Sequence, residues 1–180
     1  MTSLREQALD AAIELLGTQG LKALTHRRVD ERAGLPPGST SNYFRTREAL
    51  LEGVAEAILD RELRGIDPAG FAPQSVDQLV DLLVALLDRT TGEQRVLTSA
   101  RLVVFVEAAH RPALSQKLSG GRAAMRAFLE PVLAHLGADD PQTATAAVMA
   151  CAEGLILHRI ARHDNSDVRP LLELVLRSAL

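Results

Sequence analysis

The sequence feature that most constrains the fold is a helical spacing of apolar residues that recurs along almost the whole chain. In the first segment, the apolar positions that share one helix face are Leu9, Ala12, Ile13 and Leu16. Ser3 and Glu6 form a capping-box pattern before them, and Gly17 and Gly20 end the segment. Neither strand-type alternation nor a repeat of fixed period interrupts this series. We therefore expect an all-α fold of nine helices.

Cap signals predict where these helices begin and end. Thr25 begins a short second helix that ends at Ala33-Gly34, and Pro36-Pro37 open a third that ends near Phe44. The segment Gly65 to Pro73, with two prolines and two glycines, is the best candidate for a linker. The later helix starts are expected at Thr46, at Ser75 with Gln78, at Thr91 with Gln94, at Pro112, at Asp140-Pro141 and near Ser166.

Composition excludes several classes of protein. The chain has 180 residues and 47% hydrophobic content, which is enough to fill a core. Its apolar runs are too short to span a bilayer, and its N-terminus lacks the apolar segment of a signal peptide, so we expect a cytoplasmic protein. A single cysteine, Cys151, excludes internal disulfides and a zinc site built on several thiolates.

Charge is distributed unevenly along the chain. The net charge is −3, yet residues 22–47 carry six basic and two acidic side chains, a local balance of +4. Residues 51–180 carry 13 basic and 17 acidic side chains. A short basic segment on an acidic body is typical of a localised phosphate-binding face.

The basic segment has the dimensions of a helix-turn-helix. Two short helices, at 25–33 and 37–44, are joined by the tight turn Gly34-Leu35-Pro36. We expect Val29 and Ala33 to face inward, and Gly34 to supply a turn conformation that a side chain would resist. The outward side chains of the second helix would then be short and polar.

These outward side chains are the candidates for reading DNA. Ser39, Thr40, Ser41 and Asn42 can approach base edges, and an asparagine can bind adenine through two hydrogen bonds. The flanking residues, together with the amide groups at helix N-termini, would contact phosphates and fix the register. The predicted flanking contacts are Thr25, Arg27, Arg28, Pro37, Gly38, Tyr43, Arg45, Thr46 and Arg47.

Over roughly its first quarter, the chain resembles the TetR family of bacterial regulators. The resemblance rests on Leu24-Thr25-x-x-x-Val29-x-x-Arg32-Ala33-Gly34-Leu35-x-x-Gly38-Ser39, followed by Asn42-Tyr43-Phe44-x-Thr46-Arg47-Glu48-Ala49-Leu50-Leu51. It implies a nine-helix fold in which residues 1–46 form a three-helix DNA-binding domain and residues 47–180 a helical domain for ligand binding and dimerisation. It also implies a homodimeric repressor that binds palindromic operator DNA and is released by a small-molecule inducer.

The sequence departs from the family pattern at two positions. Pro36 stands where the family has a small capping residue, so the side-chain cap of the recognition helix is expected to be absent. Ser41 stands where the family commonly has a tyrosine that touches DNA. Tyr43 would then supply a hydroxyl to a phosphate instead.

The last two helices have the pattern of a dimer interface. The ninth presents an apolar arc of about 240°, where one core face requires about 100°. In the family, the last two helices of each subunit form a four-helix dimer bundle, although both faces could also pack inside one monomer. The candidate interface residues are Thr143, Ala147, Ala150, Gly154, Leu172, Val175, Leu176 and Ala179.

The ligand is not readable from the sequence, although candidate pocket residues are. The family places the ligand among the fifth to eighth helices, and the low aromatic content argues against an aromatic cage for a quaternary amine. Taken singly, each candidate fits an ordinary core position better than a ligand contact. They are Leu86, Phe105, Met125, Phe128, Met149, Glu153 and Leu157.

Two other classes of function are an enzyme and a helical protein that does not bind DNA. Glu107-x-x-His110 has the spacing of half a di-iron site, but a second such motif is missing, and no phosphate loop or nucleophile elbow is present. We expect neither an enzyme, nor a cofactor, nor a metal. The stronger alternative is a helical ligand-binding or interaction protein that has lost DNA binding, which the missing cap and the short Ser41 would explain.

Overall fold

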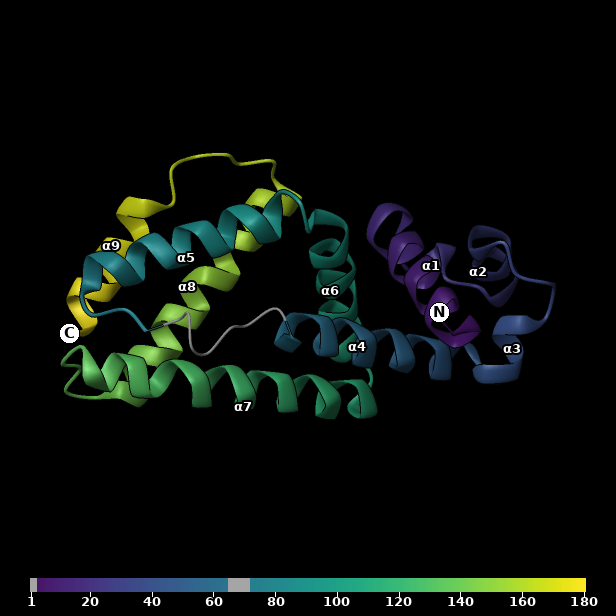
Figure 1. Cartoon of the computed structure of the whole chain (residues 1–180), viewed down its shortest axis with the longest axis horizontal. Helices are drawn as coiled ribbons and strands as arrows, with labels where there is room; N and C mark the ends of the chain where they lie inside the picture. Colours follow the sequence, from purple (N-terminus) through teal and green to yellow (C-terminus); the bar gives the residue numbers. More distant parts are fainter. Residues whose placement is uncertain (1–2, 65–71) are drawn as a thin grey trace. The chain divides into compact units, whose positions relative to one another are not determined.

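The computed structural model describes residues 3–64 and 72–180, and in this part every regular element is helical (Figure 1). The expected all-α fold with nine α-helices is confirmed for these residues. The predicted linker Gly65 to Pro73 lies outside the described residues as far as residue 71. The elements are α1 (Leu4–Gln19), the 3-10 turn η1 (Leu21–Ala23), α2 (His26–Ala33), α3 (Ser39–Tyr43), α4 (Arg47–Arg64), α5 (Val76–Thr91), α6 (Arg95–Ala108), α7 (Pro112–His135), α8 (Pro141–Ala161) and α9 (Arg169–Ala179).

Most helix starts follow the predicted caps. Ser3 and Glu6 form the capping box of α1, Thr25 accepts a hydrogen bond from the Arg28 amide, and Ser75 accepts one from the Gln78 amide. The Thr91 cap was wrong, because Thr91 ends α5 and its hydroxyl donates to the Leu87 carbonyl oxygen at 2.7 Å. α9 begins at Arg169, three residues after the predicted start.

The first of two compact units comprises residues 3–64 and 95–120. Its core is formed by α1, α2, α4 and α6, with Leu114 from the start of α7. The largest side chains that are fully buried in it are Leu16, Leu24, Val29, Leu50, Val54, Ile58 and Leu114. This core supports α2 and α3 from one side, so the predicted DNA-reading helices rest on a rigid base.

The second unit comprises residues 72–94 and 121–180. In it α5 packs against both α8 and α9 (Figure 1). Its core is lined by Leu79, Val80, Leu83 and Leu87 of α5, Leu129 and Leu133 of α7, Ala144, Val148 and Met149 of α8, and Val168, Leu172 and Leu176 in and before α9. The expected boundary after residue 46, between a DNA-binding domain and a domain for ligand binding and dimerisation, stays a prediction.

A glycine allows α1 and α6 to approach closely. A Cβ atom added to Gly17 would lie 2.1 Å from the carbonyl oxygen of Val96, so only glycine fits there. The backbone of α1 therefore rests directly on the start of α6.

Ion pairs join α4 to α6 and to the start of α7. Arg111 Nη1 lies 3.7 Å from Glu48, and Lys117 pairs with Glu56 and lies 4.0 Å from Glu52. A fourth acidic residue of α4, Glu62, lies 3.1 Å from Arg101 Nε of α6. Burial raises the pKa of Glu62, and the positive charge of Arg101 opposes that rise without cancelling it.

This raised pKa predicts a pH dependence of stability. The folded protein holds the proton of Glu62 more tightly than the unfolded chain does, so the contribution of Glu62 to the free energy of unfolding falls as pH rises from 4.5, the ordinary value, through the raised pKa. Glu62→Gln carries no such titration. We expect the variant to gain stability relative to the parent as pH rises from about 4.5 to 7.5.

Urea denaturation at a series of pH values measures this trend. Glu93→Gln, at an exposed position, controls for the loss of a surface carboxylate. A difference between parent and Glu62→Gln that stays constant with pH would contradict the assignment.

Candidate nucleic-acid interface

α2 and α3 form the predicted helix-turn-helix. Val29, on the inner face of α2, is fully buried, and Gly34 ends that helix in the left-handed conformation at φ 65°. The Leu35 amide donates to the Asp30 carbonyl oxygen at 2.9 Å, which closes the turn. The predicted inward position of Val29 and the role of Gly34 are confirmed.

The recognition helix α3 is shorter than predicted and begins later. Pro36 and Pro37 lie in the turn, and α3 begins at Ser39. The residue before it, Gly38, has a φ of 88°, a left-handed conformation that favours glycine. The Ser39 hydroxyl donates to the Pro36 carbonyl oxygen at 2.6 Å. The expectation that the prolines open the helix was wrong, because Gly38, in the left-handed conformation, separates Pro37 from the first residue of α3.

The cap of α3 comes from α2. Asp30 is 3% exposed, and its carboxylate accepts hydrogen bonds from the Thr40 amide at 2.8 Å, the Thr40 hydroxyl at 2.5 Å and the Gly38 amide at 2.8 Å. Burial by itself would raise the pKa of Asp30, but these hydrogen bonds outweigh it and lower the pKa below its ordinary value. The cap expected to be absent at Pro36 is therefore supplied by a residue of the preceding helix.

Thr40 is a correction to the predicted contacts with bases. Its side chain is completely buried and its hydroxyl donates to Asp30, so it faces the interior and cannot reach a base edge. The side chains of α3 that keep some exposure are Ser39 and Ser41, which are half-buried, and Asn42 and Tyr43, which are exposed.

The C-terminal end of α3 is anchored by Phe44. The ring is buried against Gly53 of α4, where an added Cβ would lie 2.5 Å from a ring carbon, and the Arg5 guanidinium lies 5.4 Å from the ring centroid. The backbone oxygen of Phe44 accepts a hydrogen bond from His26 Nε2 at 2.7 Å, which requires the proton on that nitrogen. Both ends of α3 are thus fixed by side chains from other helices.

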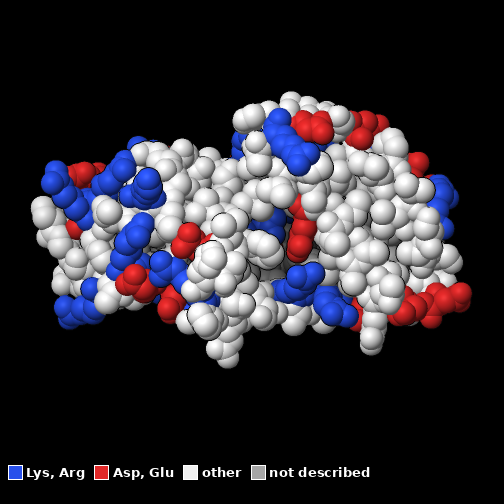
Figure 2. All heavy atoms as spheres, turned by 180° about the vertical axis from the view of Figure 1, so that it is seen from behind, with Lys and Arg blue, Asp and Glu red and all other residues white. Residues whose placement is uncertain are grey.

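The predicted phosphate contacts divide into exposed and partly engaged side chains. Arg27, Arg28 and Arg45 are exposed; Arg27 pairs with Glu31 at 2.8 Å and Arg28 with Gln19. An ion pair in contact with solvent is weak, so a phosphate can compete for Arg27. Figure 2 shows that Lys and Arg predominate over the part that carries α1 to α3.

Arg47 and Thr46 have structural roles as well. The Arg47 guanidinium donates to the carbonyl oxygens of Leu24 at 2.9 Å and Leu21 at 2.5 Å, so two of its N–H groups are not available to DNA. The Thr46 hydroxyl accepts from the Ala49 amide at 3.1 Å and caps α4. Contact of either residue with a phosphate stays a prediction.

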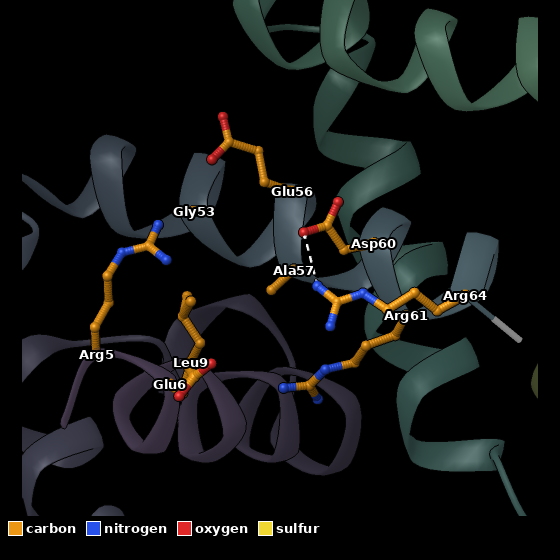
Figure 3. A pocket seen from close by; sticks show the side chains of 9 residues that line it. All are labelled: Arg5, Glu6, Leu9, Gly53, Glu56, Ala57, Asp60, Arg61 and Arg64. Carbon is orange, nitrogen blue, oxygen red and sulfur yellow. Dashed lines mark hydrogen bonds and ion pairs between the residues drawn. The ribbon is translucent and has the colours of Figure 1, made fainter. Parts of the chain in front are cut away.

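A polar cavity of roughly 180 Å³ lies between α1 and α4 (Figure 3). Arg5, Glu6 and Leu9 line it from α1, and six residues line it from α4. Its three arginines and three acidic residues balance, and Arg64 pairs with Asp60 across 3.4 Å. This balance gives the cavity no preference for an anion over a cation.

Comparison with known proteins identifies the family. Residues 8–54 match the description "Bacterial regulatory proteins, tetR family", and residues 74–180 match "Tetracyclin repressor-like, C-terminal domain". The chain belongs to the TetR family. It is a transcriptional regulator of the ligand-responsive kind, as the resemblance predicted.

Individual relatives agree with this assignment to the TetR family. The chain is 28% identical to the class C tetracycline repressor of Escherichia coli over 92% of this chain and 70% of that one. It is 30% identical to the regulator BetI of Escherichia coli over 61% of this chain, and the match spans 57% of BetI. The fold matches that of a transcriptional regulator from Rhodococcus sp. Rha1, with a TM-score of 0.79 at 22% identity over 99% of this chain and 96% of that one.

In this TetR-family protein, the candidate ligand residues lie in different surroundings, six of them in the second unit and one in the first. Met149 is buried in the core of the unit and Met125 packs against that core, while Leu86, Phe128 and Glu153 are half-buried. Leu157 is exposed on α8, and Phe105 is exposed on α6 of the first unit. The structure brings Met125 and Met149 into one cluster, and a ligand site at any of the seven stays a prediction.

The candidate dimer residues also divide. Thr143, Ala147 and Ala150 are exposed along α8 and Gly154 is half-buried beside them, with nothing within 4 Å of a Cβ added to Gly154. In α9, Val175 and Ala179 are half-buried. Leu172 and Leu176 are a correction: they are 1% and 0% exposed in the core of their own unit, so they have no surface left for a partner.

The exposed leucines of α9 were not among the predicted interface residues. Leu171 and Leu174 are 49% and 64% exposed. α8 is long and apolar enough, by length and composition alone, to cross a membrane, with a mean hydropathy of 1.3. Within the described residues, α8 and α9 therefore carry apolar surface that their own unit does not cover.

Three residues that position α3 were missed by the sequence reasoning, namely Asp30, His26 and Arg5. A cap from another helix has no fixed spacing, unlike the local capping boxes. The one available signal was an acidic residue at Asp30 beside Val29, on the face of α2 that had to be buried.

Proposed function

We propose that this TetR-family regulator is a repressor that binds palindromic operator DNA through α2 and α3 and leaves it when a small-molecule inducer binds. The observation that supports this most is the outer face of α3, where the exposed Asn42 and Tyr43 are flanked by the exposed Arg27, Arg28 and Arg45. Short polar side chains read base edges, and the arginines hold phosphates. In this proposal residues 1–46 read DNA, and residues 47–180 bind the ligand and the second subunit.

We propose a homodimer built on α8 and α9. The exposed row Thr143, Ala147 and Ala150 allows another helix to approach closely, and Leu171 and Leu174 add apolar surface beside it. A two-fold symmetric dimer requires inverted half-sites, which lie about 34–36 Å apart when they are separated by one turn of DNA. The apolar character of α8 is then that of an interface helix.

We propose that the inducer acts by changing the population of the DNA-binding state. A ligand shifts this equilibrium only by the difference between its affinities for the two states. One relative, the tetracycline repressor, is named for a small organic molecule, which supports a ligand of that class. The predicted residues of the second unit, Met125 and Met149 first, are where its contacts should be sought.

We propose that the protein works in the cytoplasm without catalysis or a bound cofactor. Across residues 3–64 and 72–180, no group of three His, Cys, Asp or Glu side chains is placed to hold a metal ion. Glu107, half of the motif with iron-site spacing, pairs instead with Arg111 Nε at 3.3 Å.

Selection of bound duplexes from a random DNA pool tests the proposal, because it reports DNA binding, symmetry and half-site spacing together. With the selected operator, Asn42→Ala should weaken binding by about tenfold to a hundredfold and relax the base preference at one position of each half-site. Arg45→Ala should instead weaken binding to the operator and to an unrelated duplex alike, and should lower the salt dependence by about one phosphate per subunit.

Fluorescence anisotropy at several salt concentrations measures both effects. Equal, salt-insensitive binding to all duplexes would contradict the proposal and favour a ligand-binding protein that has lost DNA binding. That alternative rested on a missing cap and on the short Ser41, and the Asp30 carboxylate supplies the cap.

A further inference from the structure

The recognition helix is too short to hold its own position. α3 has five residues, and its N-cap residue, Gly38, has no side chain to bond the first amides. Isolated helices of this length do not form in water, because the first turn fixes several dihedrals for a single hydrogen bond. The orientation of α3 must therefore be set by contacts from outside it.

We infer that Asp30 is a positioning residue for operator recognition: it sets the rotation of α3 about its own axis, and so selects which side chains face DNA. This inference rests on the proposed DNA-reading function of α3. The carboxylate accepts hydrogen bonds from both the amide and the hydroxyl of Thr40. It also accepts one from the amide of Gly38, the N-cap residue of α3. Three hydrogen bonds from two residues fix a rotation, whereas one would act only as a pivot.

The rotation decides which residue points outward. Thr40 and Phe44 are both buried and lie on nearly the same side of the helix, since successive residues turn by about 100°. Asn42 lies about 200° from Thr40, on the opposite side, and it is exposed. Asp30, by holding Thr40 inward, directs Asn42 outward.

The chemistry of the contact favours positioning over simple stabilisation. Among the ion pairs of the described residues none involves Asp30, so hydrogen bonds are the main compensation for its burial, with a smaller electrostatic contribution from His26. An apolar pair could fill the same volume, although the amides of Gly38 and Thr40 would then lack an acceptor. Apolar contacts are not directional, however, whereas the hydrogen bonds to a carboxylate are directional.

The test separates stability from recognition. Asp30→Ala, Asp30→Asn and the double variant Asp30→Ala/Thr40→Val are compared by urea denaturation and by their dissociation constants for the selected operator and for an unrelated duplex of equal length. Asp139→Ala, at an exposed position of the second unit, is the control for loss of a carboxylate. The measure of recognition is the ratio of the dissociation constant for the unrelated duplex to that for the operator.

We expect Asp30→Ala to reduce this ratio by about tenfold to a hundredfold, because binding through phosphates persists while base contacts are lost. Asp30→Asn keeps an acceptor for Thr40 but offers N–H to the Gly38 amide, so it should fall between the parent and Asp30→Ala. The double variant should recover only the part of the stability that Asp30→Ala loses through the unpaired Thr40 hydroxyl, because the amides of Thr40 and Gly38 still lack an acceptor, and it should recover none of the ratio.

Two outcomes would overturn the inference. One is a double variant with the ratio of the parent; the other is a single variant whose two dissociation constants rise together in step with its unfolding. Failure of the proposed function looks different, because the parent protein itself would then bind both duplexes equally.

Discussion

Ala147→Arg should give a folded monomer that binds its operator at least about a hundredfold more weakly than the parent. Ala147 is exposed on α8, in the row of small residues through which we propose that two subunits meet. The two-fold axis would bring both new guanidinium groups into one interface without partners, and burial of an unpaired charge there costs several kcal/mol. A monomer holds one half-site only and loses the hundredfold or larger gain that comes from linking two.

Light scattering after size exclusion measures the mass, and anisotropy measures operator affinity. Ala134→Arg, which adds the same charge at an exposed position of α7, is the matched control and should remain dimeric. If Ala147→Arg kept the mass of a dimer, the proposed interface would have to be placed elsewhere.

Gly17→Ala should lower the free energy of unfolding by about 2–3 kcal/mol, a large effect for the addition of one methyl group. The new Cβ would lie 2.1 Å from the carbonyl oxygen of Val96, which is backbone and cannot rotate away. Relief requires α1 and α6 to separate, and their separation uncovers the core that both helices share.

Gly120→Ala is the matched control, because Gly120 is also helical but has nothing within 4 Å of an added Cβ. There alanine should stabilise by about 0.5–1 kcal/mol through its higher helix propensity. Urea denaturation compares the two variants. Equal effects of the two substitutions would show that the contact of α1 with α6 is looser than the structure has it.

The fold was predictable because its signals are local. The cap residues Ser3, Thr25 and Ser75 each accept a hydrogen bond from the amide three residues later, so their patterns can be recognised in the sequence. The helix-turn-helix was recognisable for the same reason, since the Gly34 amide donates to the carbonyl oxygens of Asp30 and Glu31, a few residues before it.

The details of the interface were less predictable because they depend on contacts between helices. In a five-residue helix the periodic pattern is too short to show which side is buried, and so Thr40 was predicted to face outward. Arg47 bonds backbone oxygens more than 20 residues away, and no spacing rule predicts that contact. Leu172 and Leu176 belong to a helix that is apolar on most sides, so the sequence could not separate its core face from its exposed face.

The dependence of α3 on Asp30 limits how this protein's specificity can be transplanted or can evolve. Grafting Ser41, Asn42 and Tyr43 into a homologous scaffold would transfer these side chains without the contacts that orient them, unless residues 30 and 40 were transferred as well. Divergence of target sites among paralogues should then involve paired changes across the turn, with the supporting carboxylate and its hydroxyl partner inherited or replaced together.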